Sequence, residues 1–168
     1  PMAITAENLA EQYDISKEDC DHYALRSQQT WKVANDSGKF AAEIAPMEIK
    51  GKRGKVSVLE HDEHARPDAT FEAINKLGAI FKKDGTVSAG NASGISDGAA
   101  ALIVASEEAV KKHGLTPLAR LVDWEYAGVD PSVMGIGPVP AIRNLLKNND
   151  MTIDQIDRVE INEAFAAQ

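Results

Sequence analysis

Cysteine is nearly absent from this 168-residue sequence, in which Cys20 is the only one. A single cysteine excludes a disulfide within the chain and is typical of a protein from a reducing compartment. Aromatic residues are also scarce, at 5%, and no apolar run reaches the roughly 20 residues that a membrane-spanning helix needs. We therefore expect neither a disulfide-stapled domain nor a membrane span.

Positive charge is also in short supply, because 18 Lys and Arg face 26 Asp and Glu, for a net charge of −8. This balance argues against non-specific binding to nucleic acid or to acidic membranes. The one basic cluster, GKRGK at 51–55, is interpreted as a solvated hairpin tip. The remaining composition is ordinary for a globular protein and could form one good core or two small units.

A nucleophile with an adjacent base is missing by inspection, since no serine lies in an elbow motif. Cys20 shares a helical stripe with Tyr23 and Ala24, which predicts a small core residue and leaves a nucleophile as a remote alternative. The sequence HDEH at 61–64 holds two histidines and two acids. Its spacing suits no ligand pair on one helix and no cysteine joins it, so we predict a polar loop and no metal site.

What the sequence does have is a long small-residue stretch at its centre. Residues 88–98 are dominated by Gly, Ala, Ser and Asn, and residues 99–105 are apolar throughout. Small residues let a backbone turn sharply and approach another surface closely, and an apolar run of this length is typical of a strand covered on both faces. This pattern predicts the wall of a binding cleft, with a loop that serves only packing as an equal alternative.

Helix and hairpin signals fill the first half. Thr5 is expected to cap a helix over 6–14, and Ser16 with Asp19 resembles a capping box that opens a helix ending near Asp36. Residues 47–50 and 55–60 around GKRG predict a hairpin. The last element expected in this half is a short helix over Thr70–Leu77, closed by Gly78.

Strand and helix signals alternate in the second half. Strands are expected at 99–105, 117–126 and 159–161. A helix is expected through Lys112, with Ser106 as its cap and Gly114 as its end. Further helices are expected from Pro140, after Thr152, and from Glu163 onward. This order predicts an α/β layered domain. Residues 1–84 are interpreted as an excursion lying over it.

The segment VEINEAFAAQ (159–168) closely resembles the NEAF segment of thiolases. Residues 85–106, DEHARPDAT (62–70), MGIGPVPAI (134–142) and residues 4–31 are also similar to that family, in particular to its mitochondrial 3-ketoacyl-CoA branch. The match runs in order over essentially the whole chain. It implies a thiolase-like α/β fold, with a loop domain at 1–84 and the first βαβαβ half of the C-terminal domain at 85–168. The start at Pro1 and the end at Gln168 are interpreted as cuts within a longer subunit.

The resemblance also implies an activity. Thiolases cleave a 3-ketoacyl-CoA with free CoA, giving acetyl-CoA and a shortened acyl-CoA, through an acylated cysteine helped by a second cysteine and a histidine. None of these three matches a residue of this chain, and Cys20 matches neither cysteine motif, so the chain alone is expected to be inactive. The rival interpretations are a biosynthetic acetoacetyl-CoA thiolase and a non-catalytic thiolase-like subunit for CoA binding or assembly.

The residues that the resemblance places at the site are few. Asn162 matches the asparagine that holds an oxyanion-binding water, with a structural turn cap as the alternative role. Arg66 matches an arginine near the nucleotide end of CoA. The pantetheine arm is matched by Ser93 and Ala89, and its apolar wall by Phe81, Leu77, Met2 and Phe165.

The resemblance further implies CoA as a substrate, with no separate cofactor and no metal. It also implies a homodimer or homotetramer and a mitochondrial location.

Overall fold

The computed structural model describes residues 1–168 and divides into two compact units. The first comprises Pro1–Gly94, Pro131–Gly135 and Asn162–Gln168, and the second comprises Ile95–Asp130 and Ile136–Ile161. The expected division of the complete protein into domains at 1–84 and 85–168 stays a prediction.

Two helices open the first unit, α1 (Met2–Gln12) and α2 (Lys17–Asp36). Helix α1 begins earlier than expected, with Pro1 as its N-cap. Thr5 is therefore no cap, and its hydroxyl donates to Met2 O within the first turn, at 2.6 Å. The capping box of α2 is confirmed: the Ser16 side chain accepts from the Asp19 N–H, and the Asp19 side chain accepts from the Ser16 N–H.

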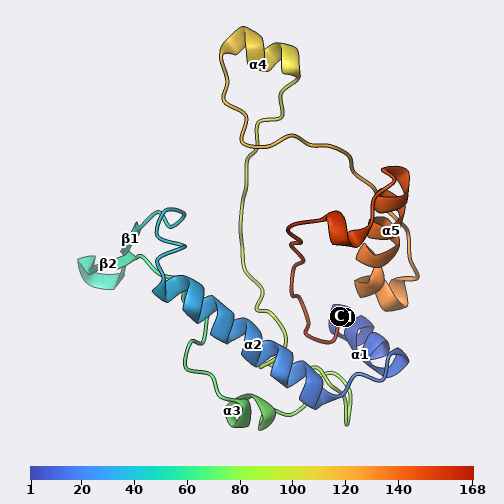
Figure 1. Ribbon diagram of the computed structural model, residues 1–168. Helices are drawn as coiled ribbons and strands as arrows, with labels where there is room; N and C mark the ends of the chain where they lie inside the picture. The colour runs from blue at the N-terminus through green and yellow to red at the C-terminus, as the bar shows by residue number, and fades with distance from the viewer. The chain divides into compact units, whose positions relative to one another are not determined.

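The hairpin that the sequence predicts is present. The short helix expected over 70–77 is present in shortened form, since it ends at Asn75 with Lys76, and not Gly78, at its C-cap. Strands β1 (Met47–Lys50) and β2 (Val56–Leu59) pair antiparallel, with Met47 opposite Leu59, and the turn η1 (Lys52–Gly54) joins them. Helix α3 (Phe71–Asn75) begins at Thr70, whose side chain accepts from the Ala73 N–H. Figure 1 shows α3 beside α2, in agreement with the contacts between them. The hairpin lies beyond the C-terminal end of α2 (Figure 1).

The core of the first unit is built from small side chains. Its buried members come from α1, from α2, from the loop over residues 85–98 (the central loop) and from the last residues of the chain: Ala3, Ala6, Ala10, Cys20, Val87 and Ala167. These side chains share one buried cluster, to which each contributes little volume. The predicted core role of Cys20 is confirmed, since it is 1% exposed.

The second unit contains α4 (Glu107–His113), α5 (Pro138–Asn148) and the turn η3 (Ile153–Gln155); the turn η2 (Pro131–Ile136) precedes α5. Helix α4 has the caps that the sequence predicts, since the Ser106 hydroxyl accepts from the Ala109 N–H and Gly114 adopts a left-handed φ of 60°. No helix of the structure is long and apolar enough to cross a membrane.

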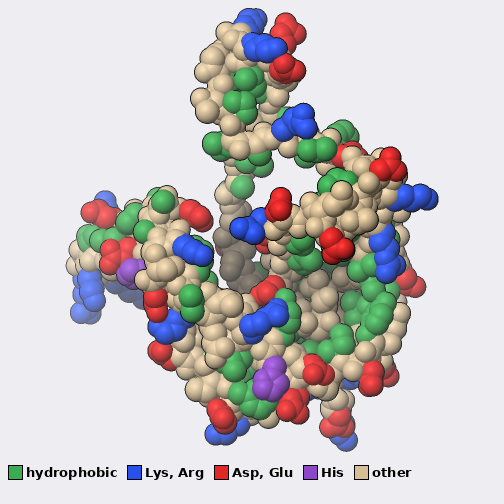
Figure 2. Space-filling model, in the orientation of Figure 1, with side chains coloured by type: hydrophobic (Ala, Val, Ile, Leu, Met, Phe, Trp, Pro, Cys, Tyr) green, Lys and Arg blue, Asp and Glu red, His purple; other side chains and the backbone are tan.

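The prediction of three strands in the second half is wrong, because the structure has no strand at any of the three places. Residues 99–105, 117–126 and 159–161 form no ladder, and Leu102 and Leu118 are 91% and 101% exposed. A strand exists only where a neighbour pairs its N–H and C=O groups, and none of these segments has such a neighbour. Their apolar side chains therefore stay at the surface, and Figure 2 shows apolar side chains exposed next to α4.

The helix expected from Glu163 is also wrong, because residues 163–168 are not helical. The backbone groups of this segment bond to another part of the chain instead of to one another. Ala164 O accepts from the Ser93 N–H and the Ala166 N–H donates to Asn91 O, both at 2.9 Å. These bonds hold the segment against the central loop in a bent, non-helical conformation.

Candidate active site

The central loop is held first by the buried carboxylate of Glu7, on α1. Glu7 is 2% exposed. Its Oε2 accepts from the Thr86 N–H (2.8 Å) and hydroxyl (2.9 Å), and its Oε1 accepts from the Val87 N–H (2.9 Å). Three donors satisfy a charge that would otherwise be costly to bury. They fix the start of the loop on α1.

A second buried carboxylate, Asp21 on α2, holds the middle of the loop. It accepts from Lys17 Nζ at 2.6 Å and from Asn91 Nδ2 at 2.8 Å. The Asn91 side chain also donates to Thr86 O and accepts from the Ser88 N–H. The Asn91 side chain therefore stabilises the conformation of the loop and also bonds the loop to α2.

Two glycines let the loop pack against its surroundings. A Cβ on Gly90 would lie 2.9 Å from Ile74 Cγ2 and from Leu77 Cδ1, and a Cβ on Gly94 would overlap the His64 ring. A larger residue at either position would require the Ile74, Leu77 or His64 side chain to move. The loop is thereby held between α3 on one side and the 61–64 segment on the other.

The NEAF segment, 162–165, packs on this loop and on α2. An isolated antiparallel bridge joins Ala92 to Phe165, next to the two backbone bonds already described. The Glu163 carboxylate accepts from the Tyr23 hydroxyl at 3.0 Å and from the Ser27 hydroxyl at 2.5 Å. Asn162 lies one residue before this attachment.

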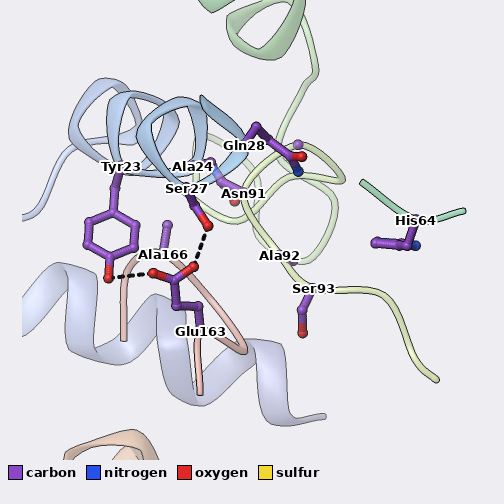
Figure 3. Close-up of a pocket in the computed structure, with 11 residues that line it drawn as sticks. Tyr23, Ala24, Ser27, Gln28, His64, Asn91, Ala92, Ser93, Glu163 and Ala166 are labelled. Carbon is purple, nitrogen blue, oxygen red and sulfur yellow. Dashed lines mark hydrogen bonds between the residues drawn. The ribbon is translucent and has the colours of Figure 1, made fainter. Parts of the chain in front are cut away.

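A cavity of about 140 Å³ opens where these three parts meet. Figure 3 shows Tyr23 and Ser27 directed from α2 toward Glu163, with Ser93 and His64 farther along the wall. The lining also includes Ala24, Gln28, Gly90, Asn91, Ala92 and Ala166. The lining joins hydroxyl, amide, imidazole and carboxylate groups to small side chains, which suits a narrow ligand with polar groups along its length.

The hydrogen bond between Tyr23 and Glu163 favours the protonated phenol by raising its pKa. The hydrogen bond to Glu163, with partial burial and the charge of Glu163, raises the pKa of Tyr23, against the opposing effect of Arg26. The Arg26 guanidinium lies 4.3 Å from the centre of the Tyr23 ring. The phenol is therefore a stable donor to the Glu163 carboxylate.

The structure brings several of the predicted site residues to this loop. Ser93 is in the cavity wall, Phe165 is bridged to Ala92, and Leu77 lies against Gly90. Ala89 is exposed on the loop itself. Asn162 is exposed as well, so its amide is open to solvent.

The other predicted residues lie outside this contact set. Arg66 lies beside the wall residues, since its N–H donates to Gln28 Oε1, while its guanidinium bonds the backbone carbonyls of residues 63–65. Met2 in α1 and Phe81 in the turn after α3 are 64% and 43% exposed.

Sequence reasoning missed the attachment of Glu163 to Tyr23 and Ser27. The two hydroxyl residues lie four apart on one face of α2, a spacing that by itself indicates a core stripe. Their polar character is the signal that could have separated them from Cys20 and Ala24. The 61–64 segment, for its part, belongs to no group of three or more His, Cys, Asp or Glu side chains able to hold a metal.

The comparison with known families follows the order of these elements. The thiolase N-terminal domain family model matches residues 1–108 and the thiolase C-terminal domain family model matches residues 115–168. The chain therefore belongs to the thiolase family. The expected α/β thiolase fold is confirmed by the family models and by the likeness to solved thiolase structures.

Individual relatives narrow the likeness. The chain is 60% identical over all its 168 residues to the mitochondrial 3-ketoacyl-CoA thiolase of Bos taurus. It is 58% identical to a human mitochondrial 3-ketoacyl-CoA thiolase solved in complex with CoA (TM-score 0.90, 99% of this chain and 41% of that one). It is 52% identical to the Bacillus anthracis acetyl-CoA acetyltransferase (TM-score 0.91, 99% and 42%). The chain spans about 42% of the length of the curated relatives it matches.

Proposed function

We propose that these 168 residues are part of an acyltransferase that cleaves 3-ketoacyl-CoA with CoA, giving acetyl-CoA and a shortened acyl-CoA, as in fatty-acid β-oxidation. The observation that carries the proposal is the 60% identity over the whole chain to a 3-ketoacyl-CoA thiolase. The docking of the NEAF segment on the small-residue loop supports it, because it gathers Asn162, Ser93 and Phe165 in one region.

Within that enzyme, Asn162 would hold a water that donates to the thioester oxyanion. An amide suits this role because it donates and accepts hydrogen bonds without titrating. Ser93 and Ala89 would border the pantetheine arm of CoA, with Arg66 toward its nucleotide end. The apolar wall would come from Phe81, Leu77, Met2 and Phe165. The human relative was solved in complex with CoA, which supports CoA as the ligand.

The first rival is an acetyl-CoA acetyltransferase, which shares the chemistry and differs in acyl-chain length. The 52% identity and TM-score of 0.91 to the B. anthracis enzyme favour it. The second rival, from the sequence analysis, is a non-catalytic subunit for CoA binding or assembly. A mitochondrial location and a homodimeric or homotetrameric state are proposed with the first function, the location from the names of the curated relatives.

The decisive experiment measures thiolysis by the complete protein on 3-ketoacyl-CoA substrates of 4 to about 16 carbons. Activity that rises with chain length supports the proposal, activity confined to acetoacetyl-CoA supports the acetyltransferase, and no activity on any substrate contradicts both. The 168-residue chain assayed alone is expected to be inactive.

Asn162→Ala in the complete protein tests the site within the same assay. A water-mediated donor is expected to matter less than a direct one, so kcat should fall toward the lower end of about 10²–10³-fold. Asn162→Asp should be worse, because a carboxylate repels an oxyanion. The alternative role of Asn162 as a helix cap is excluded because no helix follows it, and normal kcat together with a lowered melting temperature would show that its role is only structural. In the same series, Ser93→Trp should raise the KM for CoA by obstructing the pantetheine path.

A further inference from the structure

Glu163 is the one charged side chain of the NEAF segment, and two hydroxyls of α2 bond it. The Ser27 hydroxyl donates to Oε2 at 2.5 Å and the Tyr23 hydroxyl donates to Oε1 at 3.0 Å. Both carboxylate oxygens are thus engaged by residues one turn apart on a helix. Figure 3 shows the two donors and the carboxylate facing one another across the edge of the cavity.

The bonds of Glu163 to α2 differ from those of the rest of the NEAF segment, which contacts the central loop. Ala164 and Ala166 bond the central loop through their backbones, whereas Glu163 bonds α2. Asn162 lies directly before Glu163 and is exposed to solvent. Because Asn162 adjoins Glu163, a change in how residue 163 is held would shift the backbone that carries the Asn162 amide.

We propose that Glu163 is a positioning residue whose bonds to Tyr23 and Ser27 orient Asn162 toward the reacting thioester. The inference rests on the proposed function, since it assigns Glu163 a role only through Asn162. It also requires that α2 holds Glu163 in place. The two hydroxyls on α2 lie 140 and 136 positions away from Glu163 along the chain. Glu163 itself touches no reacting atom in this scheme.

The chemistry of the support predicts which variants matter. Glu163→Ala removes both bonds and should lower kcat about tenfold with the KM for CoA unchanged, since a misplacement of 1 Å can cost up to about 10²-fold. Glu163→Gln keeps the size and one good acceptor, so it should retain more activity than Glu163→Ala. Tyr23→Phe and Ser27→Ala should each lower kcat less than Glu163→Ala, and the double variant should approach it.

The test is a double-mutant cycle between Glu163→Ala and Asn162→Ala in the complete protein, read as kcat. If Glu163 acts through Asn162, its loss should change kcat less than about twofold once Asn162 is already alanine. A tenfold loss that persists in the Asn162→Ala background would overturn the inference, because a general structural effect adds independently. An unchanged kcat in Glu163→Ala would overturn it as well.

Two controls keep the outcomes separate. Tyr13→Phe makes the same chemical change as Tyr23→Phe at a phenol of the first unit that is 53% exposed, and it should leave kcat unchanged. If Asn162→Ala alone leaves kcat unchanged, the proposed site fails. If Asn162→Ala lowers kcat and Glu163→Ala does not, only the positioning role fails.

Discussion

At the scale of single residues, the fold changes the acidity of the Cys20 thiol. Burial, with the negative charges of Asp21, Asp19 and Glu7, raises the pKa of its thiol to about 11, from 9.0. The raised value favours the protonated thiol in the folded state. This residue therefore contributes stability that is fully present below pH 9 and is lost as the pH rises through 11.

The same shift predicts an unreactive thiol. At pH 8 the thiolate fraction should be about 100-fold lower in the folded protein than in the unfolded one. Alkylation by iodoacetamide should therefore be at least about 100-fold slower in native than in denaturing buffer. Mass spectrometry of the tryptic peptide spanning 18–26 follows Cys20 alone. Labelling rates within tenfold of each other would show that the thiol is accessible.

At the scale of the element, α2 shows how a local signal acts. Hydrogen bonds from the Ser16 side chain and backbone lower the pKa of Asp19, so the carboxylate is favoured in the helix. Its contribution is present above 3.8, its ordinary pKa, and is lost as the pH falls through the lowered value. The capping box should thus weaken in acid.

A peptide spanning residues 14–38 isolates this effect from tertiary contacts. Ser16→Ala should lower its helicity, measured by circular dichroism at 222 nm, by the equivalent of about 1 kcal/mol at pH 7. The difference from the unchanged peptide should narrow below about pH 4. Ser37→Ala, at the C-terminal end where the hydroxyl donates to Ala34 O, is the matched control and should change helicity less. Equal losses from the two changes would argue against the capping box.

At the scale of the whole molecule, the second unit exposes the apolar segments for which the sequence predicts strands. Ile103, Leu118 and Trp124 are 92%, 101% and 70% exposed, which is unusual for a protein that is stable by itself. Since the chain spans about 42% of its curated relatives, we propose that the rest of the complete protein supplies strands that pair with these segments.

Hydrogen exchange measures that pairing. Amides of residues 99–105 and 117–126 should exchange without protection in the 168-residue chain and become protected in the complete protein. Helix α2 makes its own backbone bonds and is the internal control, with protection in both. Equal exchange of the two apolar segments in both preparations would show that they pair with nothing.

By itself, the sequence determined the elements whose signals are local. The Ser16 capping box, the hairpin around residues 51–54, the Ser106 cap and the left-handed Gly114 are all present as predicted. Each depends on hydrogen bonds or φ angles within a few residues, so neighbouring residue types suffice to specify it. Family membership also followed from the sequence, because the matching motifs lie in order along it.

Only the tertiary structure decided how the candidate site is assembled. Glu163 meets Tyr23 across 140 positions, and Glu7 meets Val87 across 80; no local pattern encodes such partners. The strands at 99–105 and 117–126 failed for the same reason, because an apolar run specifies burial while strand formation needs a neighbour to pair with. At residues 163–168, long-range hydrogen bonds override the local helix signal. The sequence of residues 163–168 predicts a helix, yet long-range bonds to Ser93 and Asn91 hold the segment in a non-helical conformation.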